Sequence, residues 1–92
     1  MSISIHRSRN EAAVLMELDD IEIHSIANFL DNIERRFGVF IDPYGDTYVT
    51  KDMLKSIVKD IDSTTNSYRY KTLRNKLTQL MQKGDAYWFV GD

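Results

Sequence analysis

Hydrophobic and polar residues alternate at the start of the chain. Ile3 and Ile5 are separated by polar residues within residues 2–7, and this period of two is typical of a half-buried strand. A polar, turn-like stretch follows at residues 8–11. We predict that residues 12–18, AAVLMEL, form a second strand paired with the first, although their composition also suits a helix.

The pattern then changes to the period of an amphipathic helix over residues 20–37. One side of this helix carries apolar side chains three or four positions apart, namely Ile23, Ile26, Ala27, Leu30, Ile33 and Phe37. Asp19 or Asp20 can cap its first turn, because a carboxylate accepts bonds from free backbone N–H groups there. Gly38 follows two arginines and is a favourable terminator.

The most distinctive segment of the chain spans residues 38–49, led by Phe37. Its residues 42–45, Asp-Pro-Tyr-Gly, suit a type I turn, because Asp can bond the following backbone, Pro presets φ and Gly is favoured at the fourth position. Residues 47–49 can then return as a brief extended segment.

Two more amphipathic helices and a last strand complete the pattern. Thr50 is placed to cap a helix over residues 51–61, and a small polar loop at residues 62–67 separates it from a helix over residues 68–83. Residues 86–90, AYWFV, have the aromatic and β-branched content of a strand.

These elements predict a single α+β domain over residues 1–92. Three amphipathic helices pack on a small, mainly antiparallel sheet built from the two chain ends. The two ends must meet, because a hairpin from residues 2–18 alone would be only marginally stable. A length of 92 residues suits one domain.

The amino-acid composition excludes several classes of protein for this chain. Hydrophobic residues make up 42% of the chain and there are no cysteines, so it is neither compositionally disordered nor built on disulfides or thiol chemistry. No apolar run approaches the roughly 18–20 residues of a membrane helix, and the N-terminus lacks the pattern of a signal peptide. We therefore expect a cytoplasmic protein that has no membrane partner.

The net charge of −2 conceals two oppositely charged halves. Residues 11–46 hold nine acidic and two basic side chains, a local charge of −7, whereas residues 51–83 hold eight basic and three acidic side chains, a local charge of +5. Either the two halves pair with each other in the fold, or one face, by preference the acidic one, meets an oppositely charged partner.

No group of residues predicts catalysis or cofactor binding. His6 and His24 lack ligand-spaced partners, and His24 and Ser25 point about 100° apart on a helix, so they cannot form a nucleophile and base pair. The turn at residues 42–45 fails the calcium-loop pattern, because Tyr44 stands at position 3 of the loop, where an oxygen ligand belongs. We therefore predict a protein that is not an enzyme and has no catalytic residue, metal, cofactor or small-molecule substrate.

Nucleic-acid binding is an alternative that the basic half keeps open. It would use the helix over residues 68–83 and the aromatic C-terminal strand, as a small adaptor or regulatory domain for RNA or another protein. The residues concerned are Arg69, Lys71, Arg74, Lys76, Tyr87, Trp88 and Phe89. A pI near 5.6 makes nucleic acid an unlikely partner.

An acidic and aromatic surface is the stronger prediction. Phe40, Tyr44 and Tyr48 stand among Asp42 and Asp46, and aromatic side chains at a turn give a large contact area with few rotors to freeze. We expect Phe40 to pack inward and Tyr44 to be exposed.

Part of the chain resembles the small bacterial immunity proteins of polymorphic-toxin and contact-dependent growth inhibition systems. The matching positions within residues 18–47 are LDD at 18–20, FLDNIER at 29–35, FG at 37–38 and IDPYGDT at 41–47. The resemblance implies an antitoxin that binds a cognate toxin domain, commonly a basic nuclease, and blocks its activity. The residues predicted to contact this partner are Asp19, Asp20, Glu22, Asp31, Glu34, Asp42, Tyr44, Asp46 and Tyr48.

Overall fold

The computed structural model describes residues 2–9, 12–42 and 44–91, and its class is the predicted α+β. Within these residues the elements are β1 Ile3–His6, β2 Met16–Leu18, α1 Asp20–Ser25, α2 Ala27–Phe37, β3 Asp46–Thr50, α3 Lys51–Asp62, the 3₁₀ helix η1 Ser67–Tyr70, α4 Lys71–Lys83 and β4 Ala86–Gly91.

All four strands form one antiparallel sheet in the order β2-β1-β4-β3. The prediction that only the two chain ends build the sheet is wrong, because β3 comes from the middle of the chain and pairs with β4 along its whole length. The physical reason is the alternation of β3, which buries Thr47 and Val49 and leaves Tyr48 exposed. The strand predicted over residues 12–18 shortens to Met16–Leu18, since residues 12–15 are exposed and reach no core.

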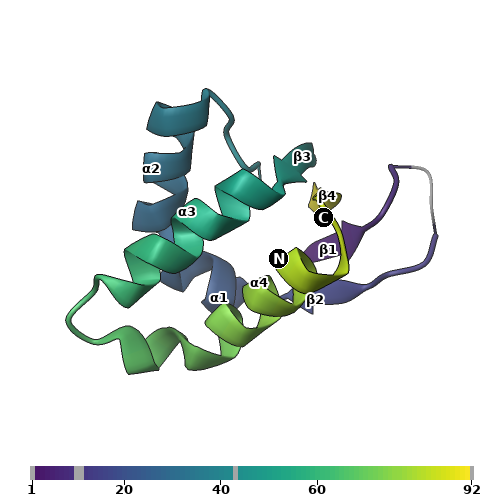
Figure 1. Cartoon of the computed structure of the whole chain (residues 1–92). Coiled ribbons are helices and arrows are strands. Elements are labelled where there is room, and N and C mark those ends of the chain that lie inside the picture. Colours follow the sequence, from purple (N-terminus) through teal and green to yellow (C-terminus); the bar gives the residue numbers. More distant parts are fainter. Residues whose placement is uncertain (1, 10–11, 43, 92) are drawn as a thin grey trace.

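The helices gather on one side of the sheet (Figure 1). On that inner face Ile3, Ile5, Val49, Tyr87 and Phe89 are buried in the same cluster as the apolar faces of α2, α3 and α4. The alternate side chains of the strands point to the opposite, open face of the sheet.

The helix predicted over residues 20–37 is broken at Ile26. α1 ends there and α2 begins there, with φ −106° and ψ 12° at Ile26, whose side chain is only 2% exposed. The break keeps Ile23, Ile26, Phe29 and Ile33 in the core. Because of this break, the described residues form four α-helices where three were predicted.

The predicted helix ends are largely present. Gly38 ends α2 in the left-handed conformation with φ 69°, and the Thr50 side chain accepts a bond from the Met53 N–H at the start of α3. The helix predicted over residues 68–83 begins as the 3₁₀ turn η1 and continues as α4.

The turn at residues 42–45 is held by Asp42. Its carboxylate accepts a bond from the Tyr44 N–H at 2.8 Å, and its carbonyl accepts one from the Gly45 N–H at 3.3 Å. Pro43, which supplies the second position of the predicted type I turn, lies outside the described residues.

Candidate functional site

A groove lies between α1, α2 and the segment that leads into the turn; we call it the α1–α2 groove. Its volume is about 280 Å³. The residues that line it come from three separate stretches of chain and are Asp20, Ile23, His24, Ala27, Leu30, Asp31, Phe40, Ile41 and Tyr44.

The groove combines an apolar floor with an acidic and aromatic rim. Ile23 and Ile41 are buried members of the core, whereas Phe40 and Tyr44 are 57% and 68% exposed. The prediction that Phe40 packs inward is therefore wrong, and Tyr44 is exposed as predicted. No lysine or arginine is among the described lining residues, and the acidic groups of the rim are the carboxylates of Asp20 and Asp31.

Local hydrogen bonds hold the aromatic wall of the groove. The Thr47 hydroxyl donates to the Phe40 carbonyl at 3.5 Å and accepts from the Asp42 N–H at 3.2 Å. The Asp42 carboxylate in turn accepts from the Tyr44 N–H. These bonds hold the backbone of Phe40, Asp42 and Tyr44 in place, and the Tyr44 ring is exposed.

The structure brings together some of the residues predicted to contact a partner. Asp20, Asp31 and Tyr44 line the α1–α2 groove. Glu34 is exposed and lies one turn beyond Asp31 on the same side of α2. Among the described residues, Asp20, Asp31, Glu34 and Asp42 have no ion pair within 4.0 Å.

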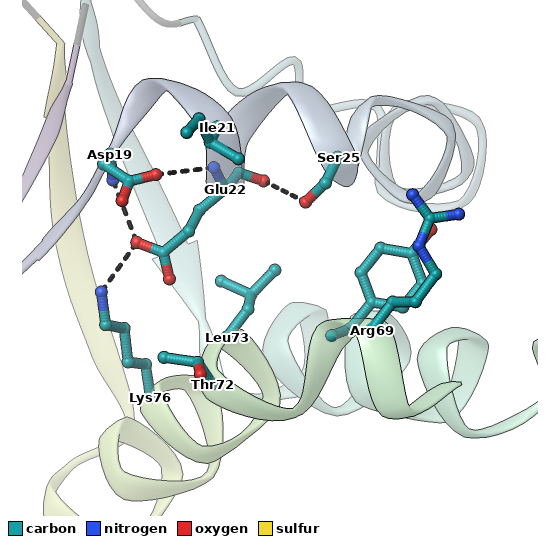
Figure 2. A pocket seen from close by; sticks show the side chains of 9 residues that line it. Asp19, Ile21, Glu22, Ser25, Arg69, Thr72, Leu73 and Lys76 are labelled. Atoms are coloured by element: carbon teal, nitrogen blue, oxygen red, sulfur yellow. Dashed lines mark hydrogen bonds and ion pairs between the residues drawn. The ribbon is translucent and has the colours of Figure 1, made fainter. Parts of the chain in front are cut away.

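Asp19 and Glu22 lie on the other side of α1 and are engaged within the chain. They form a capping box, in which the Glu22 N–H donates to Asp19 Oδ1 at 2.7 Å and the Asp19 N–H donates to Glu22 Oε1 at 3.1 Å. Lys76 of α4 donates to the same Glu22 oxygen at 2.7 Å (Figure 2). Glu22 therefore joins the acidic and the basic halves of the chain, as one interpretation of the charge pattern requires.

The second oxygen of Glu22 has a different environment. Oε2 is buried and has no hydrogen-bond partner among the described residues. A pocket of about 390 Å³ lies beside it, between α1 and the η1–α4 segment. Figure 2 shows Thr72, Leu73 and Lys76 of α4 facing α1 across this space.

Asp46 and Tyr48 lie on the open face of the sheet, away from the groove. Arg9 donates to Asp46 at 3.2 Å, and its guanidinium carbon lies 5.4 Å from the centre of the Trp88 ring. The Tyr48 and Trp88 rings are cross-strand neighbours with centroids 5.4 Å apart. The nine predicted contact residues thus divide over several surfaces.

Two of the four basic residues named for the nucleic-acid alternative, Arg74 and Lys76, are bonded to acidic side chains of the same chain. Arg74 donates two bonds to the Asp62 carboxylate, at 2.6 and 3.0 Å, and these bonds lower the pKa of Asp62 and raise that of Arg74. Lys76 is bonded to Glu22, which leaves Arg69 and Lys71 exposed.

The aromatic strand does not extend the basic surface of α4. The Tyr87 hydroxyl donates to the Leu80 carbonyl of α4 at 2.5 Å, and burial raises the pKa of this tyrosine. Phe89 is also buried. Trp88 alternates with these two side chains and therefore points to the opposite face of the sheet from α4.

The two histidines and the acidic side chains are the remaining residues with possible metal or catalytic chemistry. The described residues contain no group of three or more His, Asp or Glu side chains placed to hold a metal ion. His6 Nδ1 lies 2.9 Å from the Ala13 carbonyl, and His24 is exposed at the groove. No described helix has the length and hydropathy needed to cross a membrane.

Sequence reasoning missed the floor of the groove. Ile23 and Leu30 were assigned to the apolar side of a helix and Ile41 was given no role in a site, and periodicity cannot indicate that the packing of these side chains leaves a groove. Comparisons of the chain with protein-family models, with curated proteins and with solved structures find no match. The resemblance to immunity proteins therefore stays a prediction that rests on the quoted residues.

Proposed function

We propose that this chain is a non-enzymatic binding protein that captures a basic protein domain at the α1–α2 groove. The resemblance to immunity proteins suggests that the captured domain is a cognate bacterial toxin, neutralised in the cytoplasm. One observation carries the proposal: within the described residues, carboxylates without ion pairs and exposed aromatic rings from separate stretches of chain meet at one apolar groove that no lysine or arginine lines.

Each part of this surface has a physical role in binding. Carboxylates without ion pairs in the chain remain available to attract a basic partner and to raise its association rate. A nuclease is such a partner, because it must present positive charge to hold phosphates. Tyr44 and Phe40 supply exposed aromatic area, and a few such residues commonly dominate the free energy of an interface.

The test is binding of the full chain to the toxin domain encoded beside its gene, measured by surface plasmon resonance at several salt concentrations. We expect Asp20→Asn with Asp31→Asn to lower the association rate about tenfold at low salt and to flatten its salt dependence. Tyr44→Ala is expected to speed dissociation at least about tenfold, as loss of a hot-spot residue does.

A matched control variant removes two negative charges outside the α1–α2 groove. Glu17 and Asp85 are exposed acids without ion pairs in the described part of the chain, so Glu17→Gln with Asp85→Asn changes net charge equally. The proposal fails if this control slows association as much as the groove variant does, or if none of the variants changes binding. Asp42 and Asp46 are poor test positions, because the former holds the turn and the latter is bonded to Arg9.

A further inference from the structure

We infer that the α1–α2 groove receives one arginine side chain of the partner protein, an inference that rests on the function proposed above. The stem of this arginine lies on the apolar floor and its guanidinium group lies at the acidic rim. Size, chemistry and a comparable arrangement within the chain each support this occupant.

Size argues for a side chain instead of a metabolite. Pockets that take small-molecule ligands typically span about 300–1,000 Å³. The groove, at about 280 Å³, falls just below this range. A single long side chain, anchored by the rest of a protein interface, needs less room than a free ligand that must obtain all its affinity from the pocket.

The distribution of polar groups argues for a cation on an aliphatic stem. The floor, built from Ile23, Leu30 and Ile41, offers apolar contact to methylene groups. Asp20 and Asp31 are the carboxylates of the rim, and both lack an ion pair within the described residues. A cation that reaches them exchanges water for charge-assisted bonds.

Arginine fits this site better than lysine. A guanidinium group is planar, more weakly hydrated than an ammonium group, and able to stack on aromatic rings while it donates to carboxylates. The open sheet face of the same chain already holds Arg9 in this way, bonded to Asp46 and placed over the Trp88 ring. In the groove, Tyr44 offers the ring and Asp31 a carboxylate, and none of the described lining residues is an arginine.

The test follows backbone amide signals of the ¹⁵N-labelled full chain during titration with N-acetyl-arginine amide. N-acetyl-citrulline amide, nearly the same shape without charge, and N-acetyl-lysine amide are the matched probes. We expect saturable shifts at Leu30, Ile41 and Tyr44 with the arginine probe, and about tenfold weaker binding of the citrulline probe. Asp20→Asn with Asp31→Asn should abolish the difference between these probes, whereas Glu17→Gln with Asp85→Asn should retain it.

Three results would overturn the inference. These are equal binding of the arginine and citrulline probes, binding of lysine as strong as that of arginine, and shifts confined to the sheet face around Tyr48. If the arginine probe fails while the toxin domain still binds in a groove-dependent way, only the arginine inference falls. If the arginine probe binds the groove and the toxin domain does not bind the chain, the proposed function falls instead.

Discussion

The Lys76–Glu22 ion pair should stabilise the fold measurably, because it is partly buried and connects α4 to the start of α1. The two side chains are 29% and 14% exposed, with 2.7 Å between Lys76 Nζ and Glu22 Oε1. Lys76→Met removes the cation and leaves a nearly buried carboxylate whose other oxygen has no hydrogen-bond partner in the described part of the chain. Glu22→Gln removes the charge but keeps an amide oxygen that can still accept the Asp19 N–H of the capping box.

Two limits bound the coupling energy expected between Lys76 and Glu22. Unit charges about 4 Å apart attract by about 4 kcal/mol at an effective dielectric constant of about 20, before desolvation and side-chain entropy are subtracted. Fully exposed pairs retain only about 0–1 kcal/mol. A pair of intermediate exposure should fall between these limits, so we expect a coupling energy of about 1–2 kcal/mol.

The assay is a double-mutant cycle by urea unfolding of the parent chain, the two single variants and the double variant. Lys76→Met should be the more destabilising single change, because it leaves the charged carboxylate behind. The exposed Arg74–Asp62 pair is the control, and its coupling should be smaller despite its two short bonds. A coupling below about 0.3 kcal/mol, or a larger one for the control, would refute the argument that burial decides the strength of these pairs.

Three further predictions test other parts of the structure. Tyr87→Phe should lower the free energy of unfolding by about 1 kcal/mol through loss of the bond to Leu80. The same substitution should remove a pH dependence of stability. Because the pKa of Tyr87 is raised in the fold, its contribution to the free energy of unfolding is complete below about pH 10 and is lost as the pH rises through the raised pKa. Unfolding curves measured at alkaline pH would detect this loss in the parent chain and its absence in the variant. Gly38→Ala should cost about 1 kcal/mol in urea unfolding, because φ is 69° there, and an unchanged midpoint would contradict that strain. Arg74→Gln should return the pKa of Asp62 towards its ordinary value of 3.8, as measured by a carbon NMR titration. With Arg74 present, the contribution of the pair to stability is complete above pH 3.8 and is lost as the pH falls through the lowered pKa.

Local sequence signals predicted those elements whose formation depends on neighbouring residues. α3 begins directly after the Thr50 cap, and α2 ends at Gly38, since both signals act within one helical turn. The aromatic strand at residues 86–90 is present as β4 for a similar reason, because its side chains alternate between the core and the open face.

Signals that depend on distant contacts were missed. The break at Ile26 carries no glycine or proline, and the same apolar pattern fits one helix or two. Pairing of β3 with β4 joins segments about forty residues apart, which periodicity cannot indicate. The engagement of Glu22 by Lys76 and of Asp46 by Arg9 likewise depends on the tertiary fold. Of the predicted contact residues that line the groove, Asp20 and Asp31 have no ion pair with another described residue, and Tyr44 is exposed.

Because β4 lies between β1 and β3, the sheet cannot form during synthesis before β4 is available. β4 is the last of the four described strands to leave the ribosome. It pairs with β1 on one side and with β3 on the other, and β3 pairs with no other described strand. The growing chain can therefore form helices and the β1–β2 hairpin, but no continuous sheet and no closed core, until residues 86–91 emerge. Folding should then occur in one late step, so that nascent chains shorter than this remain accessible to proteases and chaperones.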